Sequence, residues 1–296
     1  MKKIINKLFE NVILIFKPHL YNKKKKLIFF YKLIYFLFRK IITNPIIVNF
    51  GSFKIYAYDN KKDLSKFILK NLVMWDGHQV KYINNIIKNK SSLFIDCGCS
   101  FGSYSIPIAK LNSENCKIIA IDASNVAINR IKENILLNKI ENIELLNIGI
   151  DEKEGYKNFN ENLKTLPNSG AARFDINGEK KKVTSLDKIL ENKNLDIFDK
   201  IFVKMDLEGY EYNALLGFEK TILKFRPIIL FEFSRMLINN ELFSEISFDL
   251  FLKKISYEIR DNKNIIVSVK NLIEKLNKKE KKYEVLGDFI LVSKKL

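Results

Sequence analysis

The chain of 296 residues is 47% hydrophobic and 29% charged, and this composition excludes a disordered or fibrous protein. Its length is sufficient for one large hydrophobic core, or for a core with an accessory segment. The formal net charge of +17 suits an anionic partner such as a membrane surface or a glycan, but lysine abounds along the entire chain and we attribute most of the charge to this bias. No basic and aromatic motif of nucleic-acid binding appears, so a nucleic-acid partner is not expected.

The first 45 residues differ in character from the rest and are predicted to form a basic, aromatic helical extension. Four lysines, Lys23 to Lys26, precede an apolar run from Leu27 to Phe38 that Lys32 interrupts. This run is shorter than the roughly 20 apolar residues of a spanning helix, and no small-residue cleavage site marks a signal peptide. Two interpretations stay open: a helix on a membrane surface, or an extension packed on the following domain or on a second subunit.

Residues 46–296 are predicted to form one domain, which begins with a β-hairpin that turns at Gly51 and Ser52. Helices are expected at residues 63–71 and 76–88, the second with its apolar residues on one face. Beyond them, apolar strands and helices alternate. The strands are expected at residues 93–96, 117–122, 142–148, 200–206 and 226–233, and the helices between them at 104–111, 127–137 and 210–224. Such alternation is typical of a parallel sheet with helices on both faces.

Two further segments do not follow this alternation of strands and helices. Residues 151–177 are polar and are expected to form an extended loop or a short antiparallel excursion. Near the end of the chain we expect a helix at 248–255 and a closing strand at 288–293 that pairs antiparallel to its neighbours.

The turn after the first buried strand indicates the kind of ligand. Asp96 ends this strand, Gly98 and Gly102 follow, and a helix begins near Tyr104. A strand, a glycine turn and a helix bring backbone N–H groups close to a ligand. A dinucleotide turn of the form Gly-x-Gly-x-x-Gly holds a pyrophosphate, whereas the carboxylate here would repel one. We therefore predict a cationic cofactor, S-adenosylmethionine, which carries a sulfonium and an ammonium group.

Other strands also end in or near an acid, namely Asp122, Asp206 and Glu232. In an open parallel sheet, ligands bind outside the carboxyl ends of the strands. Asp122 ends the second strand, where an acid accepts hydrogen bonds from ribose hydroxyls in nucleotide-binding folds. Methyl transfer to a hydroxyl requires a base, and Asp206, Glu208 and Glu232 are the candidates. A charge at a helix N-terminus is the alternative role for Glu208.

A family resemblance is carried by Phe94 to Ser105, Ile118 to Ser124, Asn134 with Leu137 and Asn138, Val183 to Asp187, Ile201 to Glu211, Leu216 with Gly217, and Pro227 to Glu232. Together they resemble the FkbM family of S-adenosylmethionine-dependent methyltransferases, and the Asp-Leu-Glu-Gly motif that begins at Asp206 is the most specific part. Three departures stand out. A histidine is often expected after Glu232, where this chain has Ser234 and Arg235 nearby. Cys99 and Ser100 replace the alanine and asparagine usual in the family, and Asp122 and Ala123 replace its glutamate and proline.

The resemblance implies a Rossmann-like class I α/β fold, with a seven-stranded, mostly parallel sheet and helices on both faces. It also implies O-methylation, and we expect the acceptor to be a hydroxyl of a sugar, glycan or glycolipid. The residues assigned to cofactor binding are Asp96, Gly98, Ser100, Gly102, Tyr104, Asp122 and Ala123, and those assigned to catalysis are Asp206, Glu208 and Glu232.

Two other functions remain open. A nicotinamide-dependent sugar oxidoreductase would use the same fold but should have the glycine-rich pyrophosphate turn. A non-catalytic, membrane-associated binding protein would explain the first 40 residues but not the strand-end acids. With three cysteines and two histidines no metal site is predicted, and any metal would need carboxylate ligands. We expect a cytoplasmic protein, peripheral to the inner face of the membrane if its first 40 residues bind lipid, and a homo-oligomer stays open.

Overall fold

The computed structural model describes residues 2–21, 25–42, 44–60, 62–279 and 285–294, so Lys23 and Lys24 of the lysine run lie outside the described residues. An eight-stranded sheet with the order β13-β12-β14-β11-β10-β3-β4-β5 lies at the centre of the fold. Its strands are β3 (Ser92–Cys97), β4 (Cys116–Ile121), β5 (Ile143–Leu146), β10 (Lys200–Met205), β11 (Ile228–Ser234), β12 (Tyr257–Arg260), β13 (Ile266–Val267) and β14 (Val285–Ser293).

Five neighbouring strands of this sheet, from β5 to β11, run parallel. Strand β14 lies antiparallel between β11 and β12, as expected for a closing strand. The predicted Rossmann-like α/β class is therefore confirmed. The sheet has one strand more than the predicted seven, because the two-residue β13 pairs antiparallel with β12 at the edge.

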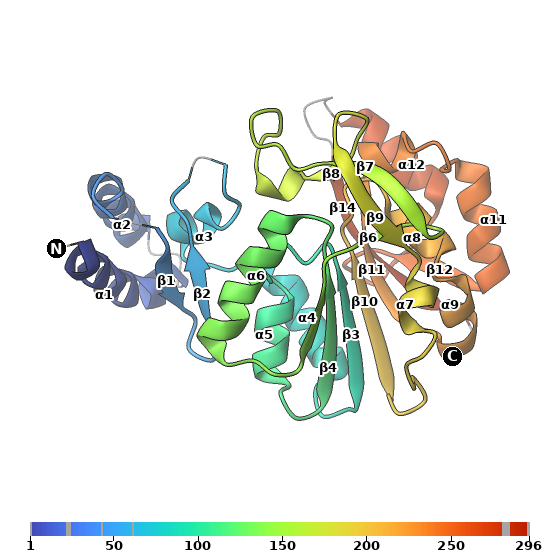
Figure 1. The fold of residues 1–296 in the computed structure, drawn as a ribbon, viewed down its shortest axis with the longest axis horizontal. Helices are drawn as coiled ribbons and strands as arrows, with labels where there is room; N and C mark the ends of the chain where they lie inside the picture. The colour runs from blue at the N-terminus through green and yellow to red at the C-terminus, as the bar shows by residue number, and fades with distance from the viewer. Residues whose placement is uncertain (1, 22–24, 43, 61, 280–284, 295–296) are drawn as a thin grey trace.

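Each face of the sheet has its own hydrophobic core, because successive residues of a strand point to opposite faces. In β3, Leu93 and Ile95 belong to one core and Phe94 belongs to the other. Figure 1 shows the helices on the two sides of the sheet. The helices on the Phe94 side are α4 (Gly77–Ile87), α5 (Ser105–Leu111) and α6 (Asn125–Asn138), and those on the other are α7 (Leu186–Leu190), α8 (Glu211–Leu216), α9 (Glu219–Phe225), α11 (Glu245–Ile255) and α12 (Val269–Lys278).

The helix expected at residues 210–224 is divided into α8 and α9. Gly217 caps α8 so close to the next segment that an added Cβ would lie 2.4 Å from the carbonyl oxygen of Asp151. The short helix α10 (Arg235–Ile238), which follows β11, and α12 were not predicted.

A second, four-stranded sheet with the order β6-β9-β7-β8 follows β5 in the chain. Its strands are β6 (Gly149–Ile150), β7 (Gly155–Asn160), β8 (Arg173–Phe174) and β9 (Glu179–Thr184), with a 3-10 turn at Ser169–Ala171. The pairing of β7 with β8 and β9 is antiparallel. The antiparallel excursion considered for residues 151–177 therefore exists, and it extends on both sides to include β6 and β9.

The N-terminal extension consists of α1 (Lys2–Tyr21) and α2 (Lys25–Phe38), which pack on each other at one end of the molecule (Figure 1). They cover the predicted hairpin, formed by β1 (Ile46–Asn49) and β2 (Lys54–Ala57), and α2 also contacts α3 (Lys66–Asn71). Phe9 and Tyr31 are fully buried in the same core as the hairpin. Within the described residues, no helix combines the length and the apolarity needed to cross a membrane. The domain boundary at residue 45 stays a prediction.

Two asparagines on α6 bind the edge of the hairpin. Asn138 Oδ1 accepts a hydrogen bond from the Lys54 N–H (2.7 Å), and Asn134 Oδ1 accepts one from the Tyr56 N–H (2.8 Å). The two asparagines are four residues apart, so they lie on the same face of the helix. The side chains of Asn134 and Asn138 thus accept the hydrogen bonds that a third strand would accept from β2, and they attach the hairpin to α6.

Packing of α1 on the domain predicts an unequal effect of two substitutions on the same helix. Phe9 is fully buried and stacks on Tyr35 and Phe38, whereas Ile15 is 64% exposed. We expect Phe9→Ala to lower the free energy of unfolding by about 3–5 kcal/mol and the control Ile15→Ala to change it by less than about 0.5 kcal/mol. Urea unfolding followed by circular dichroism measures both. Equal effects would show that α1 is not packed in solution.

Candidate active site

A cavity of about 260 Å³ lies at the carboxyl ends of the parallel strands. The turns after β3, β4 and β10, the strand β11 and the second sheet form its wall. Eight of the predicted site residues line it: Gly98, Ser100, Tyr104, Asp122, Ala123, Asp206, Glu208 and Glu232. A wider depression of about 940 Å³ at the opposite edge of the sheet contains none of these residues.

Two residues predicted to bind the cofactor lie behind the cavity wall. Asp96 is fully buried, and its Oδ2 accepts a hydrogen bond from the Ser105 hydroxyl (2.5 Å). Gly102 has a φ of +88°, and an added Cβ would lie 2.7 Å from Ile106 and 3.0 Å from Ile131. Both residues hold the turn in place from behind.

The close approach of the turn to the neighbouring strand explains the glycine at position 98. Gly98 has a φ of +79°, and an added Cβ would lie 1.9 Å from the carbonyl oxygen of Asp206. No other residue fits this backbone. Gly98 therefore brings the turn after β3 against the turn after β10, so that residues distant in the sequence form one wall.

Asp122 joins the first two turns of the site. Its Oδ2 accepts the Ser100 N–H (2.9 Å) and its Oδ1 accepts the Ser124 N–H (2.8 Å). Burial nevertheless raises the pKa of Asp122 to about 6. Each carboxylate oxygen accepts only one of these hydrogen bonds and can accept another. Asp122 can therefore bind a ligand with vicinal hydroxyls at the cavity wall.

Lys204, which was not predicted, is the buried cation of the site. Its Nζ lies 3.1 Å from Asp206 and 4.0 Å from Asp96, and it donates a hydrogen bond to the carbonyl oxygen of Gly98 (3.2 Å). Burial alone would lower the pKa of Lys204, but the carboxylates of Asp206 and Asp96 outweigh it and raise this pKa. In the sheet, Lys204 on β10 is the direct neighbour of Asp96 on β3.

More carboxylates surround Lys204 than its single charge can balance. Glu232 on β11 lies beside Asp288 on β14, and the Oε2 of Glu232 has no hydrogen-bond partner among the described residues. Burial, reinforced by the charge of Asp206, raises the pKa of both Glu232 and Glu208. The same two causes raise the pKa of Asp288 to about 6.

Glu211 shapes the turn that carries Asp206 and Glu208. It is fully buried and accepts hydrogen bonds from the N–H groups of Leu207 (2.8 Å) and Gly209 (3.1 Å). Burial raises its pKa to about 7. Glu211 thus provides the charge at the N-terminus of α8 that was considered for Glu208. Glu208, with a φ of +52°, instead lines the cavity.

Sequence reasoning missed four site residues: Asp76, Lys204, Glu211 and Asp288. A lysine inside the apolar strand 200–206 was a usable signal for Lys204, because a buried strand rarely holds an unpaired charge. Asp76, the N-cap of α4, could have been suspected from its place at a helix start. Asp288 is brought to the site by the pairing of β14 with β11, which no local pattern encodes.

The cavity gathers several carboxyl groups, and the pKa values of some of them are raised towards neutral pH. One oxygen from each of Asp206, Glu211 and Glu232 lies within 4.8 Å of the others, so these carboxylates repel one another. A cationic ligand would relieve this repulsion. Carboxyl groups with raised pKa values can also accept or release a proton near pH 7.

Comparison with known proteins identifies similar sequences and structures. A family model described as "Methyltransferase FkbM domain" matches residues 96–283. The chain is similar to the structure of an FkbM methyltransferase from Methylobacillus flagellatus KT, with 14% identity, a TM-score of 0.45, and coverage of 77% of this chain and 52% of that one. It thus spans about half the length of that protein.

Two further solved structures are similar to this chain. One is TYW2 of M. jannaschii in complex with AdoMet, with 14% identity, a TM-score of 0.38, and coverage of 84% of this chain and 85% of that one. The other is a SAM-dependent methyltransferase from Aquifex aeolicus, with 14% identity, a TM-score of 0.37, and coverage of 74% and 90%.

The raised pKa of Glu232 predicts how stability depends on pH. The folded protein keeps this carboxyl protonated while the unfolded chain releases the proton, so the wild type loses stability as pH rises above the ordinary pKa of 4.5. Glu232→Gln removes this loss. We expect the variant to match the wild type near about pH 4.5 and to be more stable by at least about 1 kcal/mol near about pH 8.

Urea unfolding at several pH values measures the difference. Glu144→Gln is the control, because Glu144 lies on β5 in an exposed ion pair with Lys193. A Glu232→Gln variant with the same pH dependence as the wild type would contradict the raised pKa.

Proposed function

This chain belongs to the FkbM family of methyltransferases, and from that premise we propose that it transfers a methyl group from S-adenosylmethionine to a hydroxyl oxygen of a sugar, glycan or glycolipid. The family model covers more than half of the chain and includes every strand that contributes a predicted catalytic acid. The observation that carries the O-methylation is the pair of half-buried carboxyls, Glu208 and Glu232, on the cavity that Asp122 also lines.

The residues present fit S-adenosylmethionine. Asp122 offers two carboxylate oxygens for the ribose hydroxyls, and Ser100 and Ala123 flank it on the cavity wall. The excess of carboxylates over Lys204 suits the positive charges of the cofactor. When bound, the cofactor supplies an electrophilic methyl group on a sulfonium. Asp96 and Gly102 act from behind by holding the turn.

The charge of the cavity selects the acceptor. Asp206, Glu208 and Glu232 would repel an acceptor that carries a phosphate or a carboxylate near its reacting atom. A neutral hydroxyl avoids this repulsion, and further hydroxyls of a sugar can donate hydrogen bonds to the carboxylates. This argument favours a carbohydrate over a nucleic acid.

The chain's own residues align the acceptor and remove its proton. A hydroxyl is a weak nucleophile until a base takes its proton. Burial and neighbouring carboxylates, Glu208 among them, raise the pKa of Glu232, so this carboxyl is protonated near neutral pH in the free protein. The positive charge of the bound cofactor would lower this pKa and favour the ionised form that takes the proton. Asp206, held by Lys204, keeps its position beside these carboxyls.

The ribose role of Asp122 predicts weaker binding of S-adenosylhomocysteine to Asp122→Asn. The substitution keeps the shape of the side chain but removes the charge that accepts two ligand hydrogen bonds. A loss of about 3 kcal/mol, or a roughly 100-fold higher Kd, is expected. Isothermal titration calorimetry measures it, with Glu144→Gln as a control of equal charge change. Unchanged affinity in a folded Asp122→Asn protein would exclude this role.

The proposed reaction predicts a methyl ether as product. We expect protein incubated with methyl-labelled S-adenosylmethionine and glycan fractions to transfer label that survives mild alkali, because an ether resists hydrolysis and a methyl ester does not. Glu232→Gln and Glu208→Gln should each lower kcat by about 10²–10⁴ while the Kd of S-adenosylhomocysteine stays within a few fold. Label that alkali releases, or label in nucleic acid, would refute the proposed acceptor class.

A further inference from the structure

We propose that the outer faces of α1 and α2 form a docking surface for an anionic lipid bilayer, on which the enzyme lies without crossing it. Here the docking surface means the exposed apolar residues of the two helices and the basic residues beside them. The proposal goes beyond the methyl transfer and does not depend on it.

Helix α2 exposes an apolar stripe to solvent. Its inner face buries Tyr31 and Tyr35, and its outer face leaves five large apolar side chains between 47% and 66% exposed. These side chains are Phe29, Phe30, Leu33, Phe36 and Leu37. Their spacing places them on one side of the helix. Large apolar groups gathered on a surface in this way mark an interaction site.

Helix α1 extends this surface, because it too has one buried apolar face and one exposed apolar face. Phe9 and Ile13 are buried against the hairpin core. Its exposed apolar side chains are Ile4, Leu8, Leu14 and Ile15, which are between 50% and 65% exposed. Since α1 and α2 pack on each other and bury their inner faces in one core, both outer faces are free for a partner.

The charge of the extension indicates an anionic partner. Residues 1–45 contain eleven lysines and arginines and a single acid, Glu10, so they carry ten of the seventeen net positive charges of the chain. Lys7, Lys32 and Lys40 are exposed beside the apolar side chains. Glu10 lies 3.8 Å from Lys7 and accepts a hydrogen bond from the Ile47 N–H. Apolar and aromatic groups flanked by lysines are the pattern of a helix that lies in the interface of an anionic membrane.

Charge also favours an anionic bilayer over a second copy of the chain as the partner of this docking surface. Two copies joined through this surface would bring together two segments that each carry ten net positive charges. Like charges at a contact oppose association. Anionic headgroups would instead attract both helices while the apolar side chains enter the acyl boundary.

The docking surface is connected firmly to the rest of the molecule. Tyr35 on α2 donates a hydrogen bond to Asp59 (3.0 Å), and Arg39, just after α2, lies 3.6 Å from the same carboxylate. Lys66 on α3 lies 2.6 Å from it as well. Asp59 thus joins α2 to the segment that leads from the hairpin to α3.

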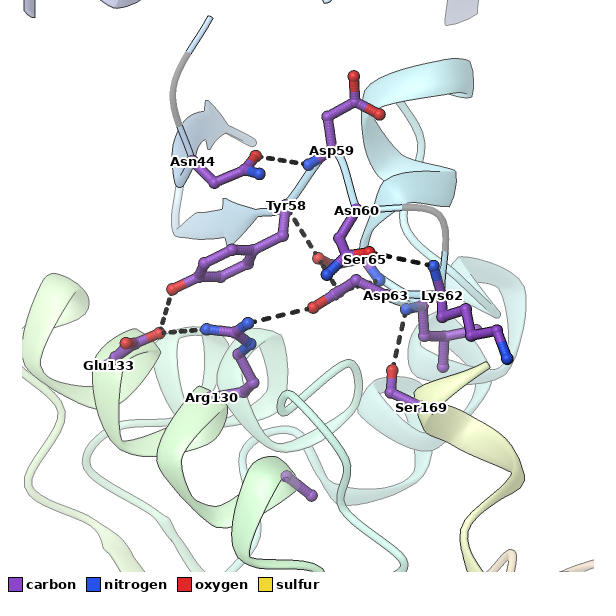
Figure 2. Close-up of polar contacts among 12 residues, drawn as sticks. Asn44, Tyr58, Asp59, Asn60, Lys62, Asp63, Ser65, Arg130, Glu133 and Ser169 are labelled. Carbon is purple, nitrogen blue, oxygen red and sulfur yellow. Dashed lines mark hydrogen bonds and ion pairs between the residues drawn. The ribbon is translucent and has the colours of Figure 1, made fainter. Parts of the chain in front are cut away.

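The same segment contacts α6 and Ser169, as Figure 2 shows. Arg130 on α6 lies 3.3 Å from Asp63 and 3.5 Å from Glu133, which accepts a hydrogen bond from the Tyr58 hydroxyl. The Leu64 N–H donates to the Ser169 hydroxyl (3.0 Å), next to the cavity wall. Because these contacts connect α1 and α2 to the wall of the cavity, a bilayer bound at the two helices would also fix the orientation of the cavity.

Vesicle flotation of the full chain tests the proposal. The probes are vesicles of phosphatidylcholine alone and of phosphatidylcholine with phosphatidylglycerol. We expect preferential binding to the anionic vesicles, weakened by added salt. The triple variant Phe29→Gln, Leu33→Gln, Phe36→Gln should bind roughly tenfold or more weakly. Lys32→Gln with Lys40→Gln should reduce the preference for anionic vesicles by about fivefold per lysine.

A matched control carries three equivalent changes elsewhere, Leu136→Gln, Ile176→Gln and Ile246→Gln, at positions that are at least 73% exposed. The control should bind vesicles as the wild type does, and all variants should keep the melting temperature of the wild type because the changed side chains are exposed. The proposal is overturned if the wild type ignores anionic vesicles or if the triple variant binds them equally well. It is also overturned if sedimentation shows a dimer that the triple variant abolishes while no vesicle binding occurs.

Discussion

The buried ammonium of Lys204 is the contact on which the geometry of the cavity depends. It lies between Asp96 on one strand and Asp206 at the end of the next, and it also binds the carbonyl oxygen of the Gly98 turn. Without this cation, the fully buried Asp96 would lack its counter-ion, which is strongly unfavourable, and the partly exposed Asp206 would lose its ion pair. Lys204 balances only part of the charge, however. The unbalanced carboxyls, Glu232 above all, have raised pKa values, and their mutual repulsion would be relieved by a ligand that carries positive charge.

The central fold could be predicted because its signals are local. Continuous apolar runs such as Leu93 to Ile95 mark strands buried on both faces, and strand-to-helix alternation limits the sheet to a parallel order. The second sheet was predicted only in part, as one of two alternatives for residues 151–177, and there is a physical reason for this. Its strand β9 contains the polar run Glu179 to Lys182 and is stabilised by pairing with β7, and pairing partners distant in the chain leave no periodic pattern in the sequence.

The gathering of acids at one cavity could be predicted where their positions follow directly from the end of a strand. Asp122, Asp206 and Glu232 each follow or end a parallel strand, and the common direction of these strands brings them to one cavity. The prediction missed Asp288, because this residue lies on the antiparallel strand β14 and is brought to the site only by the pairing of β14 with β11. Gly102 shows a different limit, because a motif residue required for packing cannot be distinguished, by sequence alone, from one that contacts a ligand.

The same helix that borders the cofactor turn also fixes the N-terminal extension. Asn134 of α6 accepts the Tyr56 N–H with its Oδ1 and donates from its Nδ2 to the carbonyl oxygen of Phe101 (2.9 Å). One buried amide therefore contacts the hairpin under α1 and α2 on one side and the glycine turn of the cavity on the other. Because a buried amide is stable only when its polar atoms are paired, displacement of the hairpin would leave Asn134 partly unpaired beside the turn. The extension and the cavity are thus parts of one packed unit, and a surface bound by the first would fix the orientation of the second.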